Sequence, residues 1–261
     1  MNSCNKIAVL TGDVHHSGLT GYPEFNYCRQ YIEVVRQCDA KCTIFLTGKC
    51  LEENRHKISE LIGLDYVELG CHTYAGHFLS LGRRYSVRTL QNYANLIGLP
   101  RKVRNFLLKN YYAHDIKSTK NVFSENGFIP ISWRTHAYLG NSILYSLLPI
   151  FGFRIVSDIV SDKLTPFTKD GLLHAPITLA DDKMFPLNFV LEHPSTAVKV
   201  FRDEILKSIN KEVSYLTIQL HPLYAKVFEF SRMKQLIKQI LERGYSFLMM
   251  KELLRWSGQN V

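Results

Sequence analysis

Short β-rich runs alternate with helical stretches along the whole chain, and this order limits the possible folds more than any other property of the sequence. The β-rich runs are residues 6–13, 42–48, 66–73, 128–134, 154–159, 172–178, 215–222 and 246–250. Several of them are apolar at consecutive positions, which is typical of strands buried on both faces of a sheet. Helical periodicity fits residues 25–38, 51–63, 86–97, 101–112, 115–126, 142–150, 196–210 and 229–243. The alternation predicts a parallel sheet with crossover helices.

About eight strands in 261 residues suit a single α/β domain, namely a distorted (β/α) barrel of about seven to eight strands. We find no internal repeat, low-complexity tract or linker, so we expect one domain over residues 1–261. A basic helical insertion is expected at about residues 83–113. No apolar run approaches the roughly 18 residues that a membrane span needs. We identify no secretory signal, and the six cysteines lack paired metal spacing, so we expect reduced thiols in the cytoplasm.

The formal net charge of +9 is concentrated in one segment. Residues 83–126 contain nine Lys and Arg residues against Asp115 and Glu125. A local basic patch suggests an anionic partner, although a solvated helical face has the same composition. Within this segment an apolar stripe at helical spacing favours contact with the barrel or a partner, and a membrane-surface helix over 100–112 is the alternative. No nucleic-acid module accompanies the charge, so nucleic-acid binding is not expected.

Titratable side chains gather just after the predicted strands, where the active sites of α/β barrels lie. They are Asp13, His15, His16, His72, His77, Arg134, His136, Asp158 and His221. Three neutral imidazoles with an open fourth position form a catalytic site of the zinc type, in which bound water has a pKa near 7. A carboxylate that is not a ligand can accept the water's proton, and a histidine opposite can protonate a leaving group. The set predicts metal-assisted hydrolysis of an acyl bond.

These residues resemble the polysaccharide deacetylases, the NodB-homology carbohydrate esterases of family 4, in the right order over nearly the whole chain. The first motif of that family, T-F-D-D-G or F-D-V-D, is similar to T-G-D-V-H here. Asp13 matches the general base, and His15 takes the place of the metal-binding aspartate. The second motif, H-[ST]-x-x-H, is similar to "HTYAGH", in which His72 is followed by His77 one residue late.

The later motifs are similar in part. The third, R-x-P-x-G, is reduced to Arg134 in "WRTHAY", and the fifth matches "QLHP", which makes His221 the general acid. The fourth, an aspartate that supports the acid histidine, best matches Asp158, with Asp181 as a second candidate. We interpret His136 and His174 as core or rim residues rather than ligands.

The resemblance implies a metal-dependent de-N-acetylase of an N-acetylated amino sugar in envelope or capsule polysaccharide biosynthesis. A divalent ion, Zn²⁺ first, would be held by His15, His72 and His77, with His16 as an alternative to His15. A backbone N–H near Ala137 would stabilise the oxyanion. A deformylase or O-deacetylase would use the same groups, and a catalytically silent carbohydrate-binding barrel is the rival from another class.

Three further residues are assigned to the substrate. Tyr74, inside the second motif, is expected to contact the sugar. Arg101 and Arg104, in the basic segment, are expected to attract an anionic group on it, such as a nucleotide, a lipid-linked phosphate or an acidic glycan precursor. The expected partner is therefore a glycan or small molecule that is anionic.

Overall fold

A computed structural model describes residues 6–75, 98–161, 164–178, 187–211 and 213–257. Its centre is a curled sheet in the order β6-β7-β5-β4-β3-β2-β1-β8, with β9 paired to β1. Every pair is parallel except β6 with β7. The predicted distorted (β/α) barrel is confirmed. The strands are β1 Lys6–Val14, β2 Cys42–Leu46, β3 Val67–Cys71, β4 Ser132–Trp133, β5 Ile155–Val156, β6 Phe167–Lys169, β7 Leu172–His174, β8 Tyr215–Gln219 and β9 Tyr245–Phe247.

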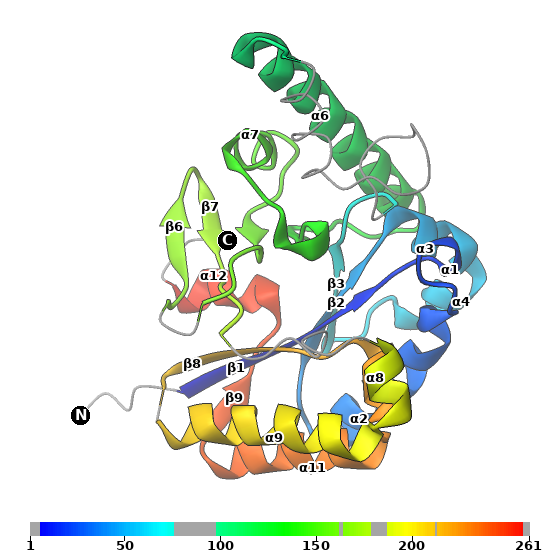
Figure 1. The fold of residues 1–261 in the computed structure, drawn as a ribbon, viewed down its shortest axis with the longest axis vertical. Coiled ribbons are helices and arrows are strands. Elements are labelled where there is room, and N and C mark those ends of the chain that lie inside the picture. Colours follow the sequence, from blue (N-terminus) through cyan, green and yellow to red (C-terminus); the bar gives the residue numbers. More distant parts are fainter. Residues whose placement is uncertain (1–5, 76–97, 162–163, 179–186, 212, 258–261) are drawn as a thin grey trace.

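The longer helices lie outside the sheet, with α9 and α11 on one side of it and α6 and α7 on the other (Figure 1). They are α1 Ser17–Thr20, η1 Glu24–Tyr27, α2 Cys28–Gln37, α3 Gly48–Glu53, α4 Arg55–Ile58, η2 Ser59–Leu61, α6 Arg101–Glu125, η3 His136–Tyr138, α7 Ser142–Leu147, α8 Leu187–Glu192, α9 Pro194–Asn210, α10 Pro222–Val227, α11 Phe230–Glu242, η5 Met250–Glu252 and α12 Leu253–Trp256. None of those within the described ranges is long and apolar enough to cross a bilayer.

Each of the eight predicted strands has a counterpart, whereas β6 was not predicted. The two helices predicted at 101–112 and 115–126 are one continuous helix, α6, because neither Gly nor Pro interrupts the residues between them. The helix predicted at 86–97 and much of the insertion expected at 83–113 lie outside the described residues.

Strand β1 organises the barrel because it pairs with three others. Its first residues, Lys6 to Ala8, pair with β9, and its last, Leu10 to Val14, pair with β2. Strand β8 runs along its other edge. The other edge of β8 meets the segment after β7 through a side chain: the backbone N–H of Thr217 donates a hydrogen bond to the hydroxyl of Thr178 at 2.8 Å. The carboxyl ends of β1, β3, β4 and β8 therefore face one common rim.

The buried side chains form two cores. The larger fills the space between the sheet and the helices, and the smaller lies inside the barrel around Val9, Phe45 and Leu173. Helix α2 shows why these segments fold as they do, since its buried residues recur at helical spacing: Cys28, Tyr31, Ile32, Val34 and Val35. Packing on both faces fixes the strands, and with them the direction of the side chains at the rim.

Helix α6 is joined to the rim by a buried carboxylate. The side chain of Asp115, 6% exposed, accepts the N–H of Tyr74 at 3.1 Å, two residues after His72 and three after the end of β3. Burial raises the pKa of Asp115 to about 7, and the bond from Tyr74 lowers it only in part. The helix thus holds the chain where it leaves the sheet.

We expect Asp115→Asn to stabilise the protein at pH 8 by about 2–4 kcal/mol and to have little effect at pH 4. The folded carboxyl keeps its proton to about pH 7, whereas the unfolded one loses it near 3.8. The folded state therefore binds more protons in this window, so wild-type stability falls as pH rises from about 4 to 7 and then levels. Asparagine keeps an acceptor for the Tyr74 N–H and never ionises. Urea unfolding of both proteins from pH 4 to 8 measures the difference, and a difference that did not change with pH would contradict this account.

Candidate active site

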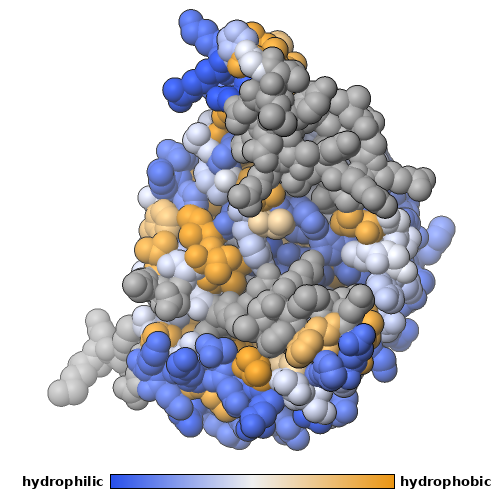
Figure 2. Space-filling model, in the orientation of Figure 1, coloured by the Kyte–Doolittle hydropathy of each residue, from blue (hydrophilic) through white to orange (hydrophobic). Residues whose placement is uncertain are grey.

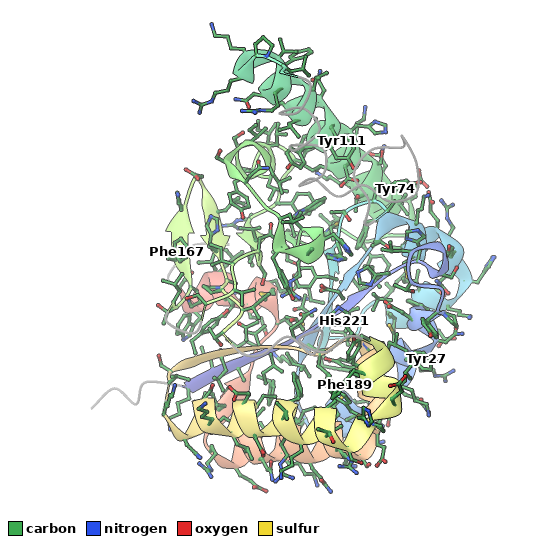
Figure 3. All side chains as sticks on the ribbon, viewed as in Figure 1. Tyr27, Tyr74, Tyr111, Phe167, Phe189 and His221 are labelled. Carbon is green, nitrogen blue, oxygen red and sulfur yellow. The ribbon has the colours of Figure 1, made fainter. Side chains whose placement is uncertain are left out.

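The carboxyl ends of four strands bring the predicted polar side chains together. Asp13 is the second-last residue of β1. His72 and Arg134 directly follow β3 and β4, and His221 stands two residues after the end of β8. Figure 3 shows His221 near the centre of the molecule. All four side chains are almost completely buried.

Gly12 allows β1 to approach the segment that carries His221. A Cβ at residue 12 would lie 2.8 Å from the carbonyl oxygen of Leu220 and 3.1 Å from Cδ of Pro222. Leu220 also donates its N–H to the oxygen of Thr11 at 2.8 Å, which extends the β1–β8 ladder by one bond. His221 then precedes α10, with Pro222 at the first helical position. The glycine therefore sets how near His221 lies to Asp13.

The two oxygens of Asp13 have different surroundings. Oδ1 accepts a hydrogen bond from Nη1 of Arg134 at 2.9 Å. Oδ2 lies 3.8 Å from Nε2 of His72 and 3.8 Å from Nε2 of His221. The guanidinium therefore fixes the carboxylate in orientation and favours its charged form, and the second oxygen faces the histidines.

Arg134 is fully buried inside the barrel and bonded on every side. Nε donates to the carbonyl oxygen of Ser157 at 3.1 Å, and Nη2 donates to its hydroxyl at 2.9 Å. Nη1 also donates to the hydroxyl of Thr11 at 3.1 Å and to Oε1 of Gln219. The guanidinium carbon lies 4.2 Å from the centre of the Phe45 ring. These contacts leave the side chain one position, directed at Asp13.

Hydrogen bonds at Nδ1 determine the tautomers of two histidines. Nδ1 of His15 lies 2.9 Å from Oε2 of Glu24, which also accepts the backbone N–H of His15 at 2.8 Å. Nδ1 of His72 lies 2.9 Å from the carbonyl oxygen of Arg134. Both partners are acceptors, so each Nδ1 carries the proton and each Nε2 keeps its lone pair.

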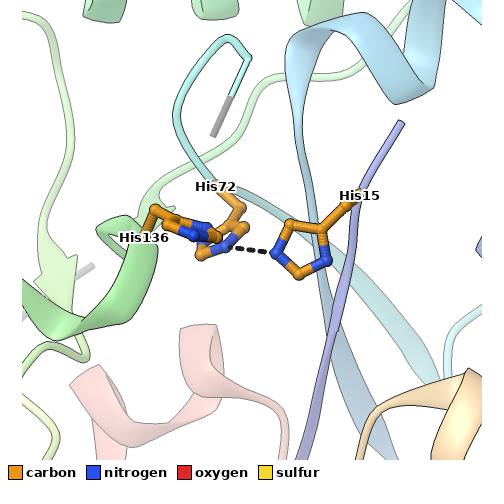
Figure 4. Close-up of side chains that lie close together, drawn as sticks. All are labelled: His15, His72 and His136. Atoms are coloured by element: carbon orange, nitrogen blue, oxygen red, sulfur yellow. Dashed lines mark hydrogen bonds between the residues drawn. The ribbon is translucent and has the colours of Figure 1, made fainter. Parts of the chain in front are cut away.

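These two lone pairs face each other. Nε2 of His15 and Nε2 of His72 are 3.2 Å apart, drawn as a dashed line in Figure 4. Two neutral imidazoles cannot share this contact without an added proton or a cation. Tetrahedral zinc with bonds of 2.0–2.1 Å places two ligand nitrogens about 3.3–3.4 Å apart. The spacing and the tautomers therefore fit a metal ion of the zinc type.

A third imidazole belongs to the same group, and it is not the one that the motif predicted. Ligand nitrogens of His15, His72 and His136 all lie within 4.8 Å of one another. The ring of His136 is 5.2 Å from that of His15 and 5.5 Å from that of His72, measured between centroids. The sequence placed His136 among the polar side chains of the core or rim but did not make it a ligand. His77, expected as the third ligand, lies outside the described residues.

Unusual backbone conformations follow two of these histidines. Thr73, directly after His72, has φ of +52°, and Ala137 and Tyr138, directly after His136, have φ of +53° and +57°. Left-handed conformations are unfavourable for residues other than glycine, above all for a β-branched one such as Thr73. Such residues cluster at functional sites, where the surrounding structure enforces them. Here they turn the chain so that both rings point to the same place.

Asp158 is bonded to the segment that carries His136. Its carboxylate accepts both the backbone N–H and the hydroxyl of Thr135, the residue between Arg134 and His136. Burial raises the pKa of Asp158 to about 6, although Thr135 and the charge of Arg134 lower it in part. These contacts favour a role in holding the segment 134–136, and the predicted support of His221 stays a prediction.

The other predicted residues are spread more widely. Ala137 lies in η3 beside His136, and His16 is buried at the start of α1. Tyr74 donates its hydroxyl to Glu52 at 3.1 Å, and its ring lies against Gly48 at the start of α3. Arg101 and Arg104 are in the first turn of α6, which projects away from the sheet (Figure 1). Asp181 lies outside the described residues.

Sequence reasoning missed Glu24, and it placed His136 at the rim without counting it as a ligand. A ligand role for His136 had one possible signal, since it stands two residues after the motif arginine. Glu24 had none, because its separation from His15 by nine positions matches no metal-site spacing. Its carboxylate is brought back to β1 by the short helices that follow the strand.

No protein-family model and no curated protein matches this sequence. Solved structures do match. A protein from Mycobacterium smegmatis, named among the polysaccharide deacetylases, aligns with a TM-score of 0.70 and 17% identity over 98% of this chain and 93% of its own. The peptidoglycan deacetylase PdaC from Bacillus subtilis aligns with a TM-score of 0.56 and 14% identity over 97% and 92%.

A third match is a CE4 family pseudoenzyme from Bacillus anthracis, with a TM-score of 0.58 and 13% identity over 96% of this chain and 66% of its own. At these identities the likeness shows the fold. It confirms that the chain has the fold of the polysaccharide deacetylases, as its motifs predicted.

Proposed function

We propose that this protein is a metal-dependent hydrolase that removes the acetyl group from an N-acetylated amino sugar. The observation that carries the proposal is the facing pair of Nε2 atoms on His15 and His72, 3.2 Å apart and beside the carboxylate of Asp13. A fold that recurs in deacetylases supports it, and so does a carboxylate held by a buried arginine at the same rim.

Three imidazoles would hold the ion, and a bound ion would polarise the amide carbonyl and acidify a water molecule. His15 and His72 are the first two ligands. His136 is the third in the described part of the chain, and His77 stays a prediction for that place. A set of neutral nitrogen ligands favours zinc, although other divalent ions bind imidazole too.

The protein's own groups move the protons. Oδ2 of Asp13 accepts the proton of the attacking water, because Arg134 holds the carboxylate ionised and in place. His221, whose Nε2 is 3.8 Å from that oxygen, lies where it can pass a proton to the departing amine. The backbone near Ala137 is placed beside His136, where an N–H would stabilise the developing oxyanion.

The substrate that we propose is a glycan precursor with an anionic group, used in envelope or capsule polysaccharide synthesis. The concentration of positive charge at residues 83–126 supports an anionic group. We propose a cytoplasmic reaction, since the five described cysteines are free thiols, as expected where thiols stay reduced.

The proposal is tested by elemental analysis of the purified protein together with amine release from a panel of N-acetyl sugars and sugar nucleotides. We expect about one divalent ion per chain and release that stops when a chelator removes the ion. O-acetyl and N-formyl sugars in the same panel decide between acyl groups. A bound ion with no release from any substrate would favour the silent carbohydrate-binding barrel, and a chain that binds no ion would refute the metal centre.

Glu24 gives a sharper test of the centre. Partners that orient a ligand histidine typically contribute 10–100-fold to metal affinity. We expect Glu24→Ala to weaken zinc binding by about that factor, measured by competition with a chromophoric chelator. Glu24→Gln should recover most of the affinity, because an amide oxygen can still accept from Nδ1 and the N–H of His15. Equal affinity in all three proteins would show that Glu24 does not orient the ligand.

A further inference from the structure

The N-terminal end of α6 extends beyond the other labelled elements of the molecule (Figure 1). The helix packs into the core of the protein from Leu108 and Tyr112 onwards, and we call this part of it the anchor. These two side chains are 3% and 1% exposed. The hydroxyl of Tyr112 accepts a hydrogen bond from Asn141, which caps α7. Residues 101–107 precede this anchor, and we call them, with Lys109, the α6 tip.

The α6 tip carries large apolar side chains that are exposed. Val103 is 43% exposed, Phe106 63% and Leu107 48%. Single exposed apolar side chains are ordinary, but three on adjacent turns form a patch that indicates an interaction surface. Figure 2 shows apolar and hydrophilic side chains gathered at this end of the molecule.

The pattern around the helix axis is specific. At about 100° per residue, Val103, Phe106 and Leu107 fall within an arc of about 100°. This arc lies roughly opposite the direction of the buried Leu108 and Tyr112. Lys102 and Lys109 fall on one side of it, and Arg104 falls on the other. The exposed face is therefore an apolar ridge with basic side chains along both flanks.

We propose that the α6 tip binds the surface of an anionic lipid bilayer, with its apolar ridge in the interface and its basic flanks on the headgroups. Helices that lie in a membrane interface combine these same features. Anionic headgroups attract clustered Lys and Arg, whose stems reach along apolar surface while the charges stay in water.

The charges favour lipid over a second copy of this chain. Residues 101–114 contain no Asp or Glu, so two tips brought together would place like charges opposite each other. The ridge is also convex and projecting, which suits insertion among headgroups better than the capture of a peptide. The surface would hold the rim close to substrates carried on lipid, although vesicle binding itself does not depend on the proposed activity.

Co-flotation of the full chain with vesicles tests the proposal. We expect binding to phosphatidylcholine vesicles that contain phosphatidylglycerol, little binding to phosphatidylcholine alone, and weaker binding as salt rises. The double variant Phe106→Ser/Leu107→Ser should bind at least about tenfold more weakly. Its matched control is Ile129→Ser/Ile150→Ser, which changes apolar side chains that are 86% and 75% exposed elsewhere and should bind as the wild type does.

A charge series separates the two components of binding. Arg101→Gln/Lys102→Gln/Arg104→Gln should lose the preference for anionic vesicles, whereas Lys199→Gln/Arg202→Gln/Lys207→Gln, three exposed changes on α9, should keep it. Thermal unfolding shows that each variant is folded. Absence of binding to either vesicle, or equal loss in a variant and its control, would overturn the proposal. A dimer that Phe106→Ser/Leu107→Ser dissociates, with no vesicle binding, would assign the ridge to a second copy instead.

Discussion

Replacing Asp13 by asparagine should lower turnover at least about 100-fold and leave the metal bound. The amide keeps an acceptor for Nη1 of Arg134, so the side chain stays in place. It can no longer take a proton from water through the atom that now faces His72 and His221. Turnover under saturating substrate and metal content after desalting measure the two effects separately.

Asp13→Asn also removes the carboxylate that balances a fully buried guanidinium, and breaking such a pair is destabilising by about 3–5 kcal/mol. A control must therefore separate lost chemistry from lost stability. Ser157→Ala removes a different bond to Arg134, at Nη2 and away from Asp13. We expect it to lose stability and keep most of its turnover. Loss of the metal in Asp13→Asn would make Asp13 a ligand instead of the base.

For His72→Ala we expect metal and activity to be lost together. His72 supplies one of the two nitrogens that face each other at 3.2 Å, and its removal opens the centre to water. Elemental analysis after desalting measures the bound ion. His174→Ala is the matched control, because His174 is also buried, at 2% exposed, but its ring stacks on Phe167 and it is not one of the three clustered histidines. Stoichiometric metal in His72→Ala would reject the ligand assignment.

The same measurement decides the third ligand. If His136 completes the centre, His136→Ala should lose the ion as His72→Ala does, and His77→Ala should retain it. The reverse result would restore the ligand that the second motif predicted. Loss in both variants would mean that the ion has four nitrogen ligands and no open position for water, which contradicts the proposed hydrolysis.

The sequence predicted the position of a residue correctly where that position follows from the strand that the residue belongs to or directly follows. Consecutive apolar residues identified β1, β2, β3 and β8, and the side chains directly after them, such as His72 and His221, had to lie at one rim. Strand β6 was not predicted, because its three residues, Phe167 to Lys169, are half-buried or exposed and form no apolar run.

The rest of the site depends on contacts that no local pattern encodes. The direction of the His136 side chain follows from the left-handed conformations at Ala137 and Tyr138 and from the hydrogen bond that Thr135 donates to Asp158. Glu24 reaches His15 only because the chain returns to the end of β1 after α1. Such positions are set by the assembled barrel, so residue type alone left His136 at the core or rim and gave Glu24 no place in the site.

The buried guanidinium of Arg134 also bears on how the protein folds. Its bonds join residues up to 123 positions apart, on β1, after β5 and on β8. A partly assembled sheet would enclose this charge without the carboxylate and the amide oxygen that balance it, at a cost of several kcal/mol. We therefore expect intermediates with only some of these strands docked to be poorly populated. The protein should lose its outer strands and its active site in one cooperative transition, without a stable half-barrel on the way.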